Sequence, residues 1–298
     1  MFRTVFITKG QYLTIKDEWL LINYGDTVKK VPLSDIKNLF IDNVYINISA
    51  YALQKLAKYG INAILCDDTH LPCCNLLPIN THYRPYGVLK KQIALTDAFK
   101  NLLWQRIVKA KIINQGTALK MSGAGTKVCE RMQQLAQEVL SGDTGNREGI
   151  AAKMFFRNFY GCDFIRFEND IINIALNYGY AVIRSSVARS LCAYGYNCAL
   201  GIHHISETNP FNLADDLMEP LRPLADIWVW QNNEDLVDTL TKNNKIGLAN
   251  IINGDIACGN KIMKVHNAVD KYIASLTTAI DNADVNKLII PIIGEKFV

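Results

Sequence analysis

The stretch GIHHISETNPFNLADDLMEPLRPLAD, residues 201–226, places two adjacent histidines ahead of a cluster of acidic residues and a helix start. An Asn-Pro pair interrupts the chain, and Asn212 is a candidate N-cap for a helix with Asp215 at its third position, as in a capping box. Glu219 lies four residues beyond Asp215, so the two carboxylates are predicted to share one face of this helix.

These histidines and carboxylates have two interpretations. An imidazole from a loop and a carboxylate one turn into a helix can converge on one divalent cation, and a nitrogen–oxygen ligand set suits Mg2+ or Mn2+. The helix dipole alone also favours carboxylates at a helix start, and a histidine beside apolar residues is commonly a structural one. Two ligands are too few, so the metal hypothesis needs a third from elsewhere. The candidate residues of this stretch are His203, His204, Asp215, Asp216, Glu219 and Asp226.

The composition is that of a folded protein of moderate charge. The 298 residues are 49% hydrophobic and 20% charged, with a formal net charge of +4. This balance permits nucleic acid as a partner without requiring it. The eight cysteines include no C-x-x-C pair, which argues against a zinc or thioredoxin-like site. With no signal peptide and no apolar run of membrane-spanning length, the expected location is the reducing cytoplasm, away from the membrane.

The first part of the chain reads as β-rich. Between residues 4 and 46, short runs of β-branched and aromatic residues alternate with turn signals, which predicts hairpins in an antiparallel sheet. Ser49 is expected to cap a helix, and INAILC at 61–66 reads as a buried strand. His70 adjoins two aspartates, which an Asx-type turn explains more simply than a metal site. A segment containing prolines and glycine then marks a boundary, giving a predicted β-rich domain at 1–80.

The pattern after Gly87 is helical. It predicts a larger, all-α domain at 81–298 and therefore an α+β fold class. Basic residues recur on these helices, either as a solvated face or as a surface that contacts DNA phosphates. The candidate phosphate contacts are Lys109, Lys111, Arg166 and Arg189.

Glu148 follows a glycine-rich break and falls in the first turn of a predicted helix. The helix dipole favours a carboxylate there, which is a purely structural role. Alternatively, Glu148 supplies the missing third metal ligand, presented rigidly at a helix N-terminus. The spacing leaves both roles open.

Three ordered segments together resemble one family. GNREGIAAKMFF (145–156), NDIINIALNYGYAVIRS (169–185) and the stretch 201–226 are similar to signature regions of the CRISPR-associated integrase, the DNA-capturing enzyme of CRISPR adaptation. The chain length and the motif NPFNLADDLMEP are most similar to those of the type II branch. The resemblance implies a catalytic metal site formed by Glu148, His204 and Glu219, where many relatives have Asp as the acidic member. His203 has no role in the family pattern.

The resemblance also implies a reaction and an assembly. The 3′-hydroxyl ends of a captured double-stranded DNA fragment would attack the CRISPR repeat, and homodimers would assemble on a small partner protein. We expect the β-rich domain to make the homodimer contact, because its sheet edges and faces need covering. Two other classes stay open: a plain metal-dependent nuclease, which cuts DNA without joining it, and a non-catalytic DNA-binding assembly subunit, which shows no strand chemistry.

Overall fold

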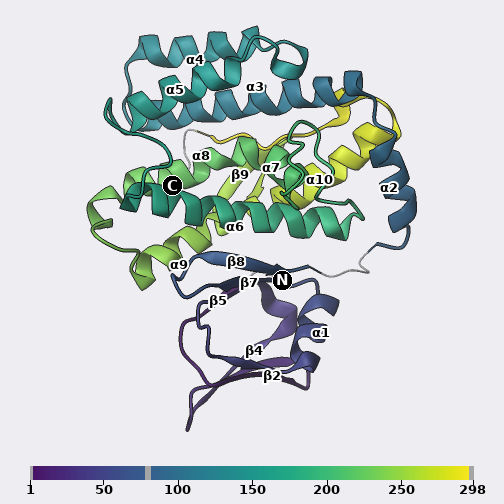
Figure 1. Ribbon diagram of the computed structural model, residues 1–298, viewed down its shortest axis with the longest axis vertical. Helices are drawn as coiled ribbons and strands as arrows, with labels where there is room; N and C mark the ends of the chain where they lie inside the picture. The colour runs from purple at the N-terminus through teal and green to yellow at the C-terminus, as the bar shows by residue number, and fades with distance from the viewer. Residues whose placement is uncertain (1–2, 78–81, 295–298) are drawn as a thin grey trace. The chain divides into compact units, whose positions relative to one another are not determined.

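The computed structural model describes residues 3–77 and 82–294 (Figure 1). The chain forms two compact units, Met1–Tyr83 and Arg84–Val298. Strands dominate the first unit and helices the second, which confirms the α+β fold class. Residues 78–81 of the predicted boundary segment (75–87) lie outside the described residues. Pro85, which was expected in that boundary segment, instead begins the first helix of the second unit.

The first unit contains two four-stranded sheets, ordered β1-β5-β7-β8 and β4-β3-β2-β6. The strands are β1 (Arg3–Ile7), β2 (Tyr12–Lys16), β3 (Trp19–Asn23), β4 (Val28–Pro32), β5 (Ile36–Ile41), β6 (Asn47–Ile48), β7 (Asn62–Cys66) and β8 (Pro72–Leu76). The predicted hairpins join β2, β3 and β4. The prediction of one antiparallel sheet is wrong, because β1 pairs in parallel with β5, and β5 with β7.

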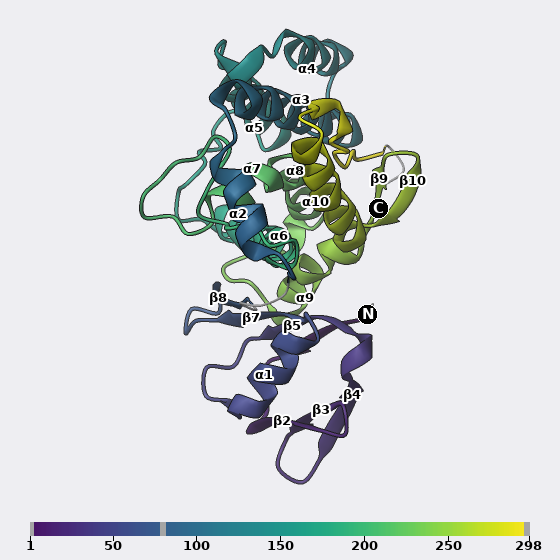
Figure 2. The same cartoon turned by 90° about the vertical axis from the view of Figure 1, so that its right-hand side faces the viewer.

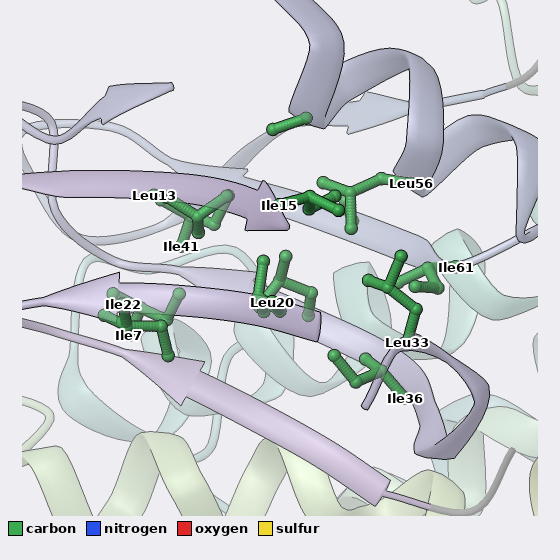
Figure 3. Packing of buried hydrophobic residues seen from close by; sticks show 13 residues of the cluster. Ile7, Leu13, Ile15, Leu20, Ile22, Leu33, Ile36, Ile41, Leu56 and Ile61 are labelled. Carbon is green, nitrogen blue, oxygen red and sulfur yellow. The ribbon is translucent and has the colours of Figure 1, made fainter. Parts of the chain in front are cut away.

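The core of the first unit lies between these sheets and α1 (Ala50–Lys58) (Figure 3). In β2, buried Leu13 and Ile15 alternate with exposed residues, as expected for a strand with one face on the core. All of β5 is buried, which suits a strand with parallel neighbours on both sides. Ser49 caps α1 as predicted, accepting a hydrogen bond from the amide of Ala52 at 3.1 Å.

The turn that contains His70 is structural, as the Asx-turn interpretation predicted. A side-chain oxygen of Asp67 accepts hydrogen bonds from the amides of Thr69 and Leu71, both at 3.0 Å. His70 Nδ1 lies 2.7 Å from a carboxylate oxygen of Asp42. Asp67 therefore needs no metal to explain its position in this turn.

The second unit is built mainly of helices. The α-helices are α2 (Pro85–Ile93), α3 (Asp97–Met121), α4 (Thr126–Glu138), α5 (Arg147–Phe159), α6 (Ile171–Ala193), α7 (Asn212–Met218), α8 (Arg222–Gln231), α9 (Lys242–Asn250) and α10 (Val265–Asp281). Short 3-10 turns of the chain are η1 (Leu33–Asp35), η2 (Ser141–Asp143), η3 (Glu219–Leu221), η4 (Asn233–Asp235), η5 (Ile251–Asn253) and η6 (Val285–Lys287). Within the described residues, no helix is long and apolar enough to cross a bilayer.

The all-α prediction for this unit is wrong in one place. Strands β9 (Asp255–Cys258) and β10 (Lys261–Lys264) form an antiparallel hairpin. Its two-residue loop is Gly259-Asn260, and Gly259 adopts a φ of +62°, which glycine reaches without steric cost. This short signal was missed because helical periodicity dominates the sequence around it.

Two long helices organise the second unit. α3 packs against α4, α5 and η3, and α6 packs against α7, α8 and α10 (Figures 1 and 2). The C-terminal segment 288–294 packs on this unit: Ile292 bridges Ala257 of β9, and the amide of Ile293 donates to the side-chain oxygen of Asn114 at 2.9 Å. α3 is thereby held on several sides, and its middle faces the functional residues.

Candidate active site

Glu148 lies in the first turn of α5, but other residues cap that helix. The Asn146 side chain accepts a hydrogen bond from a first-turn amide at 3.2 Å. The Asp143 carboxylate accepts from the amides of Arg147 and Glu148 at 2.8 and 3.0 Å. Because these side chains satisfy the exposed helix amides, the Glu148 carboxylate is not needed as a cap. It reaches Lys111 instead.

Lys111, from the middle of α3, bridges the two predicted glutamate ligands. Its Nζ lies 2.6 Å from Glu148 Oε1 and 2.5 Å from Glu219 Oε2. The other Glu219 oxygen, Oε1, lies 2.7 Å from Arg222 Nε. The Lys111 and Glu219 side chains are only 11% and 5% exposed, so this is a buried cluster of charges.

The charges in this cluster keep one another ionised. Burial raises the pKa of Glu219, but Arg222 and Lys111 outweigh it and bring the pKa down to about 2. Burial likewise lowers the pKa of Lys111, but Glu219 and Glu148 more than compensate, so that the net shift is upward. At neutral pH the cluster therefore contains carboxylates and an ammonium rather than neutral groups.

Asp216 positions His204. The Asp216 side chain is fully buried, and its Oδ1 lies 2.7 Å from His204 Nδ1 and accepts from the His204 amide at 3.0 Å. Its Oδ2 accepts from the amides of Ile202 and His203 at 2.5 and 3.0 Å. The bond to Asp216 raises the pKa of His204. A carboxylate at Nδ1 favours the tautomer protonated there, which leaves Nε2 as a lone-pair donor.

His203 has a different environment. Its ring stacks on the buried Trp104 of α3, with centroids 4.2 Å apart and an interplanar angle of 1°. The His204 ring meets the same indole edge-on at 5.8 Å. This geometry favours His204 as the residue that faces the carboxylates, and His203 as the one that anchors the loop to α3.

The structure brings Glu148 and Glu219 together around one cationic atom, and Glu219 is near enough to His204 to contribute to its raised pKa. Across residues 3–77 and 82–294, no three His, Cys, Asp or Glu side chains are arranged as a metal-binding group. Between the two glutamates, the Lys111 ammonium occupies the position that a cation would take.

One local prediction for the stretch 201–226 is wrong. Asn212 is not an N-cap but the first residue of α7, and its amide group donates to the carbonyls of Ala199 and Ser206 at 3.1 and 2.8 Å. Phe211 precedes it without a side-chain cap. Asn212 thus closes the histidine loop, a role that depends on the path of the chain rather than on helix signals.

Glu219 directly follows α7 with α-helical dihedral angles and begins the 3-10 turn η3. Asp215 and Glu219 both lie near enough to His204 to help raise its pKa. Asp215 also accepts a hydrogen bond from Asn209 at 2.7 Å. The carboxylate with the central role is Asp216, which the sequence left without one. The sequence feature that indicated this role was the adjacent His-His pair, because the backbone amides of its loop need a hydrogen-bond acceptor.

The four predicted phosphate contacts do not form one exposed surface. Lys111 is buried between carboxylates, and Arg189 is 10% exposed with its Nη2 2.8 Å from Asp270 Oδ1. Arg166 donates to the side chains of Asn173 and Asn177 at 2.7 and 2.6 Å. The assignment of Lys111 and Arg189 to an exposed basic face is therefore wrong, because both side chains are largely buried and paired with acidic residues. The half-buried Lys109 stays a prediction.

Asp226, the last residue of the stretch, supports this cluster from a buried position. Its Oδ1 accepts a hydrogen bond from the Tyr180 hydroxyl at 2.9 Å, and the Arg222 guanidinium lies 4.7 Å from the centre of the Tyr180 ring. Burial raises the pKa of Asp226 to about 7. Arg222 thus connects Glu219 to the Tyr180–Asp226 pair.

This pKa predicts a pH-dependent stability. The folded protein holds the Asp226 proton more tightly than the unfolded chain, so the residue lowers the free energy of unfolding as pH rises from about 4 to about 7. We expect Asp226→Asn to lack this decrease in the free energy of unfolding, which is on the order of a few kcal/mol. In thermal melts across this pH range, the melting temperature of the variant should rise relative to that of the wild type as pH increases. The exposed Asp238→Asn is the control, and a flat difference for Asp226→Asn would contradict the assignment.

Comparisons with known proteins agree with this architecture. Residues 5–241 match the family described as CRISPR associated protein Cas1. A CRISPR-associated endonuclease Cas1 of Neisseria meningitidis serogroup C is 39% identical over 291 residues, covering 97% of this chain and 95% of the relative. A CRISPR-associated endonuclease Cas1 of Saccharolobus solfataricus is 27% identical, covering 75% of this chain and 73% of that one.

Solved structures share the fold. A casposase bound to an integration product has a TM-score of 0.76 at 16% identity, covering 96% of this chain and 93% of the other. A CAS1 protein from Thermotoga maritima has a TM-score of 0.73 at 12% identity, covering 94% and 97%. The family match and the Neisseria relative confirm the resemblance and the enzyme class predicted from the sequence. The chain therefore belongs to the Cas1 family of CRISPR-associated endonucleases, and it is an enzyme of CRISPR adaptation.

Proposed function

We propose that this enzyme joins the 3′-hydroxyl ends of captured DNA fragments to the CRISPR repeat in a metal-dependent transesterification, with Glu148, His204 and Glu219 as the metal ligands. One observation carries the proposal: two glutamates from different elements meet at one buried cation position, close to a histidine held by Asp216. Helix-dipole stabilisation alone does not explain this convergence, because α5 has other caps.

The donor set fits an oxygen-preferring divalent ion. The space between Glu148 and Glu219 already accommodates the ammonium of Lys111, and two carboxylates with one imidazole leave coordination positions for water and phosphate oxygens. No cysteine belongs to the set, so Mg2+ or Mn2+ is favoured over zinc. Such an ion would stabilise charge on the phosphoryl oxygens and help to activate the attacking hydroxyl.

The protein's own residues supply orientation. Asp216 holds the His204 ring through Nδ1 so that Nε2 is available, and Arg222 fixes one oxygen of Glu219. Such outer partners keep ligands in place and set the histidine tautomer. Trp104 packs against the histidine loop and excludes water from its inner side.

The partners follow from the same assignment. One structural neighbour, with a TM-score of 0.73 and 17% identity, is a Cas6-RT-Cas1--Cas2 complex, in which Cas1 assembles with Cas2. We propose that this chain likewise binds double-stranded DNA and a small Cas2-like protein, and acts as a homodimer of the type II branch. A cytoplasmic location fits the absence of any disulfide among the eight cysteines, all of which lie in the described ranges.

Joining and cutting can be separated directly. Purified protein, its Cas2-like partner and a repeat-bearing plasmid are incubated with a labelled duplex and Mn2+ or Mg2+. We expect label to become covalently attached to the plasmid, and this attachment should depend on the ion. The attachment should be lost when the duplex ends in 2′,3′-dideoxynucleotides, which lack the 3′-hydroxyl. Plasmid cleavage without attachment would support a plain nuclease. The absence of any strand chemistry would support an assembly subunit.

Homodimer contact through the first unit is a separate prediction. The β2–β3 surface exposes Tyr12 and Trp19, which are 51% and 43% accessible in the monomer. Such aromatic residues commonly mark protein interfaces. A fragment of residues 84–298 should be monomeric by light scattering while the full chain is dimeric, and Trp19→Lys in the full chain should weaken the dimer. A fragment that melts cooperatively and remains dimeric would contradict this assignment.

A further inference from the structure

Four charged side chains meet in the proposed active site, and their charges cancel. Glu148 and Glu219 are the anions, and Lys111 and Arg222 are the cations. The Lys111 and Glu219 side chains are 11% and 5% exposed, and those of Glu148 and Arg222 are partly buried at 24% and 27%. Lys111 is the only member of this cluster that contacts both carboxylates.

We propose that Lys111 is an internal cation that keeps the two glutamates together in the metal-free enzyme and that the incoming divalent ion must displace. The inference rests on the proposed function, because that function makes Glu148 and Glu219 metal ligands. It assigns to Lys111 a positioning role in place of the phosphate contact expected from the sequence.

The contacts of Glu219 argue for displacement rather than sharing. Arg222 holds Oε1, and Lys111 holds Oε2, the oxygen on the side of Glu148. An ion placed between the two glutamates would therefore bind oxygens that now contact the ammonium. A divalent ion bound to these oxygens and an ammonium in contact with the same oxygens repel each other strongly at low dielectric.

Lys111 also stabilises the protein before the ion arrives. Two carboxylates brought together in a buried site repel each other and lose their hydration, and removal of the partner of a buried charge is strongly destabilising. The ammonium offsets this repulsion and preserves the spacing of the ligands. Displacing the ammonium costs free energy, which weakens ion binding. Lys111 therefore keeps the ligands in place but lowers the affinity of the site for the ion.

Displacement also couples the ion to the substrate. The four-residue cluster is neutral without metal, and once a divalent ion has displaced the Lys111 ammonium, the ion with Glu148, Glu219 and Arg222 carries a net charge of +1. A positive site attracts a phosphodiester, whereas a neutral one does not. On this account DNA is drawn into the site only after the ion has bound.

The test measures Mn2+ binding directly, by electron paramagnetic resonance and calorimetry, in the full-length protein without DNA. Lys111→Met removes the charge and keeps the length, and Lys111→Gln keeps a neutral donor. We expect both to bind Mn2+ at least about tenfold more tightly than the wild type, because a competing charge within contact distance is gone. Lys109→Met, on the same helix, is the matched control and should leave the affinity unchanged. Equal or weaker binding by the two Lys111 variants would overturn the inference.

Thermal melts give a second readout. In EDTA, Lys111→Met should melt well below the wild type, and Mn2+ should raise its melting temperature by more than it raises that of the wild type. If Lys111→Met folds only with Mn2+, that outcome supports the inference. If it fails to fold with the ion as well, Lys111→Gln decides by the same two measurements.

A ligand variant separates the inference from the proposed function. Glu148→Gln should lose Mn2+ binding if Glu148 is a ligand. If it does, and the Lys111 variants still bind no more tightly than the wild type, only the role of Lys111 is wrong. If Glu148→Gln binds Mn2+ like the wild type, or if no protein binds the ion, the metal site itself is wrong and the inference is overturned with it.

Discussion

Glu148→Ala should abolish DNA joining while leaving the protein folded. The substitution removes one carboxylate from the cation position, and with it the stabilisation of charge on the transferred phosphoryl group, so the joining rate should fall by at least about a thousandfold. Asn146 and Asp143 continue to cap α5, and Lys111 keeps Glu219 as a partner, so the protein should stay folded although it loses one ion pair of Lys111 and the dipole effect of about 0.3–1 kcal/mol. Joining assays and thermal melts of the same preparation measure the two effects.

Glu219→Ala should lose joining as well, but with a different stability. It leaves Arg222 and Lys111 without their buried carboxylate, which is expected to cost about 3–5 kcal/mol. The contrast distinguishes the partly exposed ligand from the buried one. Similar melting temperatures for the Glu148 and Glu219 variants would contradict the ion-pair geometry.

DNA binding is the control for these ligand variants. Counterion release depends on phosphate contacts, so the Glu148→Ala protein should retain duplex affinity and the wild-type dependence on salt. Lys109→Ala, on the half-buried basic position, should instead weaken binding and give a shallower salt slope. Joining at the full rate by a well-folded Glu148→Ala protein would remove this residue from the active site.

Asp216→Ala is expected to have the largest combined effect on stability and activity. The carboxylate accepts hydrogen bonds from three consecutive amides and contacts His204 Nδ1, all from a fully buried position. Its removal leaves those donors unpaired, and we expect a loss of roughly 3–5 kcal/mol together with loss of joining. The free energy of unfolding in denaturant and the joining rate are the measurements.

Asp216→Asn separates the positioning of His204 from folding. The amide preserves the shape but not the charge, so the pKa of His204 should fall from its raised value, as followed by NMR titration of the imidazole. His203→Ala is the matched control, because His203 stacks on Trp104 and lies outside the proposed ligand set. Loss of joining in His203→Ala with joining intact in His204→Ala would reverse the assignment of the two histidines.

The sequence by itself determined the fold class, the family and most element types. Periodicity and caps are local properties, so Ser49 marked the start of α1, and the glycine-rich break marked the start of α5 with Glu148 in its first turn. The order of three motifs was enough to identify the Cas1 family and to nominate two glutamates and one histidine for the site. Each of these inferences depends on neighbours within a few turns of the chain.

Only the tertiary structure decided which groups meet. Strand β1 pairs with β5 rather than with its neighbour in sequence, and Lys111 turns from an apparent basic face into a cluster formed by α3, α5 and η3. Asp216, for which helical spacing suggested no role, holds His204 from a buried position. These outcomes depend on Coulomb attraction and hydrogen bonding between residues far apart in the chain. Local patterns do not record such partners, because burial and charge pairing become defined only when the helices pack.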